Sequence, residues 1–429
     1  MNFIELIKND MKPALGVTEP AAIALACAKA RSLCGEEPVS VSVEVNSGIY
    51  KNAYTCGIPN TSVVGNEFAA ALGCWFGDAD KNLMVLDDIT EENVEFCRKK
   101  IEEGKVEVLL GDISSEISIK ATVKSAHDIC EAHISGKHTN ISFLCRNENV
   151  LKDESPAAEQ KAEDGNSEIE NASLLGMYNF AKTVNIEELS FIAEAYKVNN
   201  ALADAAFENP RCVFAAKMLS ANSGKKITEN PEKTAMTLSV GAAEARVLGL
   251  NYPAMSITGS GNHGIICTMP LYGYAKATQT DDEMLLRATA LSYLVTMYIK
   301  HYSGVLSSLC GCAIAAGTGM ACGLSFMKGG DYRAIYHTLL NMTNSITGMI
   351  CQGGNHGCVM KVVSAVKLGF SASQFAMDGA FIEECHGIGD YSAEQTMRNI
   401  GLIANPGMAA TEEIIVNIMK NKDFMAAHD

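Results

Sequence analysis

The hydrophobic pattern changes once along this chain of 429 residues. Apolar and polar residues alternate over residues 40–46 and 116–124, which is typical of strands with one buried face. After residue 172 the apolar spacing becomes mostly helical. Shorter apolar runs, also predicted to be strands, lie at residues 106–110, 128–134 and 140–145.

This change predicts an α+β fold with two domains. An N-terminal α/β-mixed domain of helices and antiparallel strands is expected over residues 1–150, with helices in residues 2–35 and 91–103. A large, mostly all-α domain is expected over residues 172–429. Its helices are predicted at residues 186–200, 210–220, 233–249, 282–302, 332–350, 359–368, 373–384, 393–400 and 411–419.

The segment between the two regions has its own composition. Residues 151–170 are acidic, lack aromatic side chains and hold few apolar ones. Such a segment cannot bury enough apolar surface to form a core. We therefore interpret residues 151–171 as a solvated linker or surface loop.

Charge and cysteine usage limit the class of partner. The chain has 34 Lys and Arg against 50 Asp and Glu, so its formal net charge is −16. Nucleic acid and anionic lipid are not expected, because both need a basic face. The N-terminus lacks the apolar run of a signal peptide, and fifteen cysteines is an odd number for a secreted disulfide framework. We expect a cytoplasmic protein with reduced thiols and a small-molecule partner, and we leave a homo-oligomer open.

Two long segments contain no Asp, Glu, Lys or Arg, at residues 303–327 and 334–360. Both exceed the length that spans a bilayer. The first is rich in Gly, Ser and Cys, and the second contains two histidines and several amides, which are costly in lipid. We predict buried helices and loops at the centre of the helical domain rather than membrane spans.

These uncharged segments carry two groups of cysteines. One is Cys310-Gly-Cys312, and the other runs from Cys351 through Gln-Gly-Gly-Asn-His-Gly to Cys358. The chain has no CxxC, so zinc ribbons and ferredoxin-type runs are excluded. Glycine-rich backbone can point N–H groups at sulfur atoms, which suits an iron–sulfur site. Buried structural cysteines are the alternative.

Two polar motifs are candidates for a substrate site. Gly259-Ser-Gly-Asn-His-Gly264 matches GxGxxG but is a poor dinucleotide fingerprint, because Pro270 follows too soon for the helix that should come next. A substrate loop with Ser260, Asn262 and His263 is more plausible than a dinucleotide loop, and a plain turn is the alternative. At Thr18-Glu19-Pro20, Thr18 is expected to be the N-cap of a helix. The free N–H groups at this helix start could hold a substrate carboxylate, and an ordinary structural cap is the alternative.

Together, five motifs resemble the L-serine dehydratase alpha-chain superfamily, and the resemblance covers nearly the whole chain. The similarity is closest to its single-chain branch, the L-cysteine desulfidases. Many relatives resemble GCTEP at the first motif, where this chain has Val17, so any role of that cysteine is absent here. The motifs are ALGVTEPAAIALA at residues 14–26, GIPNTSVVG at 57–65, SGNHGI at 260–265, LCGCAIAAGTGMACG at 309–323 and NMTNSITGMICQGGNHGCVMKV at 341–362.

The resemblance implies a [4Fe–4S] cluster held by Cys312, Cys351 and Cys358, with one iron not bound by the protein. Cys310 is the rival of Cys312. An open iron acts as a Lewis acid and accepts a soft thiolate. The implied reaction is a non-redox lyase reaction: a base removes the Cα proton of L-cysteine, sulfide leaves Cβ, and the product hydrolyses to pyruvate and ammonia. Neither pyridoxal phosphate nor a nucleotide is needed.

The base must reach the Cα proton with a suitable pKa, and His263 and His356 are the candidates. L-serine dehydratase, with hydroxide as the leaving group, is the first alternative function. An iron–sulfur carrier or electron-transfer protein is the second. The polar residues expected around the substrate are Thr18, Glu19, Asn60, Thr61, Ser62, Ser260, Asn262 and Asn355.

Overall fold

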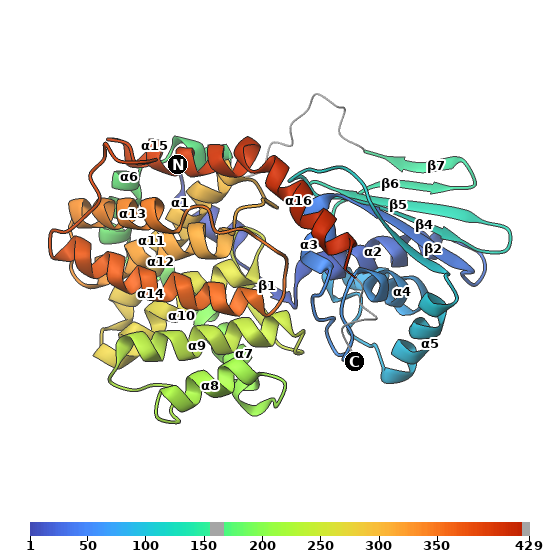
Figure 1. Ribbon diagram of the computed structural model, residues 1–429, viewed down its shortest axis with the longest axis horizontal. Helices are drawn as coiled ribbons and strands as arrows, with labels where there is room; N and C mark the ends of the chain where they lie inside the picture. The colour runs from blue at the N-terminus through green and yellow to red at the C-terminus, as the bar shows by residue number, and fades with distance from the viewer. Residues whose placement is uncertain (155–166, 423–429) are drawn as a thin grey trace.

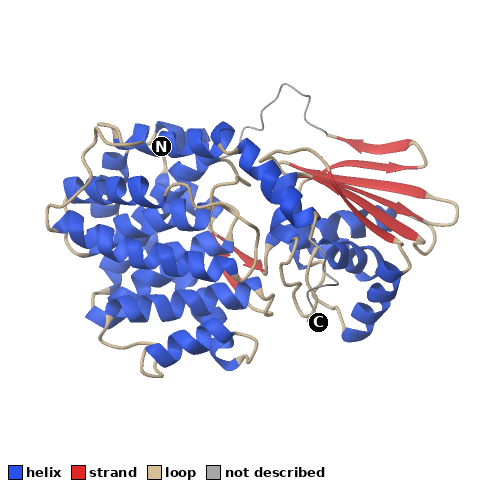
Figure 2. Ribbon diagram, viewed as in Figure 1, coloured by secondary structure: helices blue, strands red, loops and turns tan. Residues whose placement is uncertain are grey.

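The computed structural model describes residues 1–154 and 167–422 and consists of two parts that lie side by side (Figure 1). One part is a six-stranded sheet with helices on one face, and the other is a larger body made mostly of helices. Figure 2 shows this division clearly, with only the short β1–β8 pair inside the helical body. The predicted α+β class, with the sheet first and the helical region second, is confirmed.

The sheet has the strand order β3–β2–β4–β5–β6–β7. All five predicted strands are present, but the expectation of antiparallel strands is wrong for one pair, because β2 and β3 run parallel. Several helices connect these two strands, and such a long crossover permits parallel pairing. The bounds are Ser40–Val45 (β2), Val106–Leu110 (β3), Ser118–Lys124 (β4), Ile129–Ser135 (β5), Ile141–Arg146 (β6) and Asn149–Asp153 (β7).

The predicted linker begins inside the sheet. β7 pairs with β6 and extends through Asp153, so the first residues of the acidic segment form an edge strand. Residues 155–166 of that segment lie outside the described residues. A short 3₁₀ helix, η2 (Ser167–Asn171), leads into the helical body.

Two helices, α2 (Thr18–Leu33) and α4 (Asn66–Phe76), cover the inner face of the sheet (Figure 1). They approach closely because α2 is rich in alanine and because a Cβ at Gly73 would overlap the backbone of Ala24. Smaller elements complete this part: α3 (Ser47–Ala53), η1 (Ala79–Met84) and α5 (Glu91–Glu102). The expected N-cap of α2 is corrected: Val17 occupies that position, and Thr18 is the first helical residue.

The helical body surrounds one large apolar core. Most predicted helices are present within a few residues. α6 and α10 were not predicted. The helical elements of this part are α6 (Leu174–Thr183), η3 (Ile186–Ile192), α7 (Ala193–Glu208), α8 (Val213–Ala221), α9 (Pro231–Val247), α10 (Gly261–Thr278), α11 (Asp282–Ser303), η4 (Cys312–Ala316), α12 (Gly317–Met327), α13 (Tyr332–Ile346), α14 (Gly357–Met377), α15 (Ala393–Leu402), η5 (Ile403–Gly407) and α16 (Ala409–Lys420).

Two helix predictions need correction. α10 continues through Pro270, because burial between α9, α11 and α12 outweighs the ~3 kcal/mol that an internal proline costs. The two helices expected at residues 359–368 and 373–384 are one helix, α14, which ends at Met377. Gly369 does not break α14, because it lies against the side chain of Met320.

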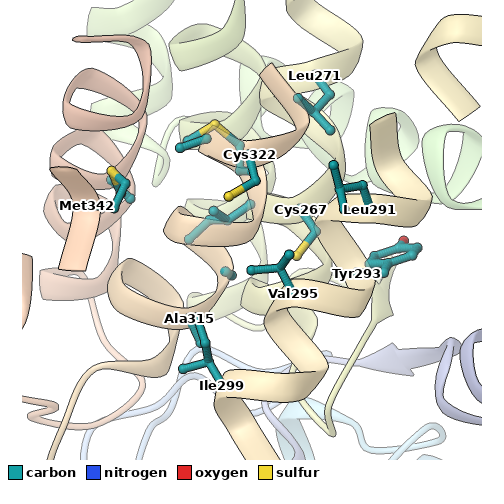
Figure 3. Packing of buried hydrophobic residues seen from close by; sticks show 14 of the residues in the cluster. Cys267, Leu271, Leu291, Tyr293, Val295, Ile299, Ala315, Cys322 and Met342 are labelled. Atoms are coloured by element: carbon teal, nitrogen blue, oxygen red, sulfur yellow. The ribbon is translucent and has the colours of Figure 1, made fainter. Parts of the chain in front are cut away.

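The latter part of the first uncharged segment lies at the centre of the helical body, as predicted, whereas the end of the second forms a partly exposed loop. Every residue of α12 is buried, and Figure 3 shows Cys322 of this helix among apolar side chains of α10, α11 and α13. Within the described residues, no helix is both long and apolar enough to cross a membrane.

Both ends of the chain cross between the two parts. The N-terminal α1 (Phe3–Asp10) packs on the helical core, and β1 (Lys12–Leu15) pairs with β8 (Pro253–Ser256). At the other end, α16 lies along α3, where the buried Lys51 and Glu412 side chains form an ion pair of 2.5 Å. Elements near both chain ends therefore connect the two parts. The domain boundaries at residues 150 and 172 stay a prediction.

Candidate functional site

A small cavity of about 80 Å³ lies where the two parts meet. We call it the cysteine pocket. The start of α2, the turn between β5 and β6, the start of α10 and the end of α11 line it, together with both cysteine segments. A larger cavity of about 430 Å³ adjoins it, and His138, Thr258 and Lys300 line both.

Four thiols line the cysteine pocket, those of Cys310, Cys312, Cys351 and Cys358. Two backbone hydrogen bonds hold the two segments side by side: Cys310 N–H donates to Met349 O (2.9 Å), and Cys351 N–H donates to Ser308 O (2.6 Å). The structure therefore brings together the three predicted ligands and the rival Cys310. The other two late cysteines, Cys322 and Cys385, do not line the pocket.

Glycines allow these segments to approach their neighbours. Gly353 has a φ of +94°, and a Cβ there would overlap the carbonyl oxygen of Lys51 on α3. A Cβ at Gly311 would lie 2.7 Å from His263 Nε2. The glycines thus seat one cysteine loop on the sheet part of the molecule and leave room for an imidazole beside the other.

Two buried lysines give the cysteine pocket positive charge. Burial lowers the pKa of Lys300 to about 8, although the nearby thiols raise it. Burial also lowers the pKa of Lys361, but the four surrounding thiols together raise it above its ordinary value, and Lys361 Nζ has no hydrogen-bond partner among the described residues. A hydrogen bond from Cys312 is the largest cause that lowers the pKa of Cys310, and Lys361 and two backbone N–H groups lower it further.

The spacing of the thiols indicates which kind of metal centre they fit. Thiolates bound to one zinc ion lie about 3.8 Å apart, given Zn–S bonds of about 2.3 Å in a tetrahedron. In the part of the chain that the structure describes, no three of the four thiols lie within 4.8 Å of one another. A polynuclear iron–sulfur cluster holds its cysteines further apart. Wide spacing, soft donors and an unpartnered lysine therefore fit a cluster better than a single ion.

The wall of the cysteine pocket that the sheet part contributes is polar and adjoins the thiols, because Cys351 Sγ lies 3.7 Å from Asn52 Oδ1. Glu19 is buried at the start of α2, where it accepts hydrogen bonds from Asn52 Nδ2 (2.9 Å) and Thr18 Oγ1 (3.2 Å). His138, from the β5–β6 turn, places Nε2 at 3.9 Å from Glu19 Oε1. Burial and Arg246 lower the pKa of His138, which Glu19 opposes. Nε2 of His138 has no hydrogen-bond partner among the described residues.

His263 also lines the cysteine pocket. Its Nδ1 is 2.6 Å from Thr258 Oγ1, whose hydroxyl also lies 2.7 Å from the carbonyl oxygen of Ile257. If the hydroxyl donates to this carbonyl, Nδ1 carries the proton and Nε2 is the free acceptor beside Gly311. Burial lowers the pKa of His263 well below its ordinary value, and Lys300 and Arg246 lower it further.

Two further polar groups face the cysteine pocket without partners. Arg246, in the last turn of α9, is 4% exposed, and its Nε has no hydrogen-bond partner among the described residues. Asn262, in the first turn of α10, is 1% exposed, and its Oδ1 is likewise unpartnered. Sequence reasoning found Asn262 but missed Arg246, His138, Lys300 and Lys361. The available signal was a charged residue inside an otherwise apolar helix, as with Arg246 and Lys361.

The structure places the predicted site residues in two groups. Those that line the cysteine pocket are Glu19, Ser260, Asn262 and His263, with Cys312, Cys351 and Cys358. Those that do not line it are Thr18, Asn60, Thr61, Ser62, Asn355 and His356.

The second group has contacts of other kinds. Thr18 lines the adjoining cavity. Asn60 donates to the carbonyl oxygen of Asp87, and Thr61 donates to that of Ile58, so both stabilise the loop before α4. His356 turns away from the thiols to Glu244, with Nε2 at 3.4 Å from Oε1. Ser62 is exposed, and Asn355 Oδ1 accepts a hydrogen bond from Gly357 N–H at the start of α14.

Known proteins resemble this chain over nearly its full length. A UPF0597 protein of Clostridium botulinum (strain Okra / Type B1) is 37% identical over 426 residues, which is 97% of each chain. UPF0597 proteins of Clostridioides difficile and Bacteroides fragilis are each 34% identical, covering 97% and 98% of this chain and 99% and 97% of their own. The serine dehydratase alpha-chain family matches residues 80–417, which include all four thiols of the cysteine pocket. This chain therefore belongs to the serine dehydratase alpha-chain family.

Proposed function

We propose that the protein is a [4Fe–4S]-dependent, non-redox lyase that converts L-cysteine into sulfide, ammonia and pyruvate. The observation that carries this proposal is one small pocket that four thiols and two buried lysines line together with Glu19, Asn262 and His263. Membership of the serine dehydratase alpha-chain family supports a serine dehydratase-like lyase as the general class.

Cys312, Cys351 and Cys358 are the proposed ligands. When bound, a cluster with three protein ligands supplies a Lewis-acidic iron for the leaving group on Cβ of the substrate. Lys300 and Lys361 offset the negative charge of the thiolates, which would otherwise be costly to bury. The structure leaves Cys310 and Cys312 as rivals, because both thiols line the pocket.

His263 is the proposed base. Its Nε2 is unprotonated in the tautomer described above and lies beside the Cys310–Cys312 turn, whereas His356 does not line the pocket. His263 takes the proton from Cα, and the electron pair of that C–H bond forms the Cα–Cβ double bond as the C–S bond breaks. Sulfide leaves with the C–S electron pair. The aminoacrylate then tautomerises and takes up water, releasing ammonia and pyruvate.

L-serine is the alternative substrate, and the name of the family favours it. The same residues would act, with hydroxide as the leaving group. Steady-state turnover of anaerobically reconstituted protein with each amino acid separates the two. We expect the larger kcat/KM for L-cysteine. A larger value for L-serine would overturn the substrate assignment, and turnover of neither would overturn the lyase.

An electron-transfer protein is the second alternative, and the fourth thiol, Cys310, favours it. Four protein ligands would leave no iron open to substrate. A redox titration of the reconstituted protein tests this alternative. Reversible one-electron cycling without any effect of L-cysteine on the visible spectrum would favour the carrier over the lyase.

A further inference from the structure

Within the described residues, the cysteine pocket contains a buried cation, Arg246, without a hydrogen-bond or ion-pair partner. Arg246 is 4% exposed, Nε makes no hydrogen bond, and its guanidinium makes no ion pair with a described carboxylate. A buried charge is costly unless it is paired. The partner that Arg246 lacks within the described residues is therefore expected to be an anion that enters the pocket.

The start of α10 adds further donors at the same place. The first hydrogen bond of this helix runs from Gly264 N–H to Ser260 O, so the N–H groups of Gly261, Asn262 and His263 have no partner within the helix. Ser260 makes no side-chain cap. The positive end of the helix dipole also favours an anion there.

Arg246 and the start of α10 are fitted to each other. Gly261 has no side chain, and a Cβ there would overlap Arg246 Nε. The guanidinium therefore rests directly on the first residue of the helix. A planar guanidinium beside free N–H groups suits a carboxylate, which accepts hydrogen bonds at both oxygens.

A charge of opposite sign in the same pocket completes the pattern. Among the described residues that line the cysteine pocket, Glu19 is the only carboxylate. It is held by Asn52 at 2.9 Å and is separated from Arg246 by more than ion-pair distance. A pocket with one fixed anion and one fixed cation matches a zwitterion such as a free amino acid.

We infer that Arg246 and the N-terminus of α10 bind the α-carboxylate of a free α-amino acid, while Glu19 binds its α-ammonium group. This inference rests on the proposed function, and it assigns the binding of the two charged groups of the substrate to residues outside the cysteine ligands. It requires the reacting side chain of the amino acid to face the thiols.

Binding of L-serine to cluster-free protein, measured by calorimetry, tests the inference without turnover. Ethanolamine is the matched probe, because it lacks only the carboxylate. We expect L-serine to bind, and R246Q to weaken it by about 30-fold or more, as for loss of one partner of a buried charge pair. R246K should lose less, about tenfold, because it keeps the charge but not the planar fork. Ethanolamine should bind R246Q and the unmodified protein within about twofold of each other.

R333Q is the control, since Arg333 is exposed on α13 and does not line the pocket. G261A is the second structural test. Its Cβ should displace Arg246 and therefore weaken L-serine binding, as R246Q does. Equal L-serine affinity in R246Q and the unmodified protein would overturn the inference, as would no L-serine binding to either. Binding that depends on Arg246 without turnover of any amino acid would uphold the inference and overturn the lyase.

Discussion

The cysteines under the sheet and those of the cysteine pocket are equally buried in several cases, yet their surroundings differ. Cys27 and Cys74 lie between α2 and α4, where burial raises the pKa of both thiols and the neighbours are apolar. In the pocket the pKa shifts differ from thiol to thiol: the hydrogen bond from Cys312 and the charge of Lys361 lower the pKa of Cys310. The hydrogen bond with Cys310 and burial raise the pKa of Cys312, and burial raises that of Cys358 to about 11. Burial by itself therefore does not mark a ligand. The proposed ligands differ from the core cysteines in the lysines and glycines beside them and in the spacing of their thiols.

The core of the helical body repeats the first pattern. Cys322 and Cys267 are fully buried on α12 and α10 (Figure 3). Burial raises the pKa of each thiol to about 12. Cys322 is only ten residues beyond Cys312 in sequence, but it faces the apolar core rather than the pocket. The comparison predicts that loss of these core thiols changes stability and leaves the metal content unchanged.

The largest expected effect is loss of the cluster. C351A, C358A and C312A should each abolish the visible absorbance of anaerobically reconstituted protein, because each removes a proposed ligand. C322A is the matched control and should keep the absorbance. If C310A loses the cluster and C312A keeps it, the ligand assignment is wrong by two residues.

The next effect is on stability, through the contact that holds the two parts together. K51M leaves Glu412 buried without its partner, and breaking such a pair costs about 3–5 kcal/mol. Denaturant unfolding measures this cost. The double variant K51M/E412M should recover part of it.

K120M is the control for that measurement, because Lys120 pairs with Glu44 on the exposed face of the sheet. An exposed pair contributes about 1 kcal/mol or less. Equal destabilisation by K51M and K120M would contradict the view that the buried pair fastens the pocket.

A smaller effect is expected from the pocket lysine. K361Q removes positive charge beside all four thiols, so the protein should retain several-fold less iron after desalting than the unmodified protein. K367Q, on the exposed side of the same helix, is the control. Full iron retention by K361Q would contradict the proposal that the charge of Lys361 stabilises the thiolates.

The smallest effect concerns Asp128, which does not line the cysteine pocket. Hydrogen bonds from Gly35, Arg146 and Asn147 lower the pKa of Asp128 to about 2. Its folded pKa is below its ordinary value, so its contribution to stability is present above about pH 4. That contribution is lost as the pH falls toward 2. D128N should be slightly less stable at pH 7, and thermal unfolding at several pH values should show the difference vanish near pH 2.

The sequence predicts the fold wherever local periodicity decides it. The alternation at residues 40–46 and 116–124 predicts β2 and β4, because one face of each strand is buried. The parallel pairing of β3 with β2 depends on how the intervening helices fold back, which no local pattern contains. α10 was missed because tertiary packing on α9 outweighs Pro270.

The cysteines of the candidate site could be predicted from the sequence, but several of its charged and titratable residues could not. Cys351 and Cys358 lie close together in a glycine-rich segment without charged residues, and this pattern is visible in the sequence. Arg246 and His138 are single residues on different elements, and only the contact between the two parts brings them together. His356 shares a motif with Cys358, but the loop directs it to Glu244 instead.

The most direct test of the central claim is a visible spectrum of anaerobically purified protein, with iron and sulfide counts, before and after L-cysteine is added. The account predicts a broad visible band, about four irons per chain as in a [4Fe–4S] cluster, a change on addition of L-cysteine, and release of sulfide. A colourless protein that takes up no iron on anaerobic reconstitution would contradict it and would leave the pocket cysteines with a structural role.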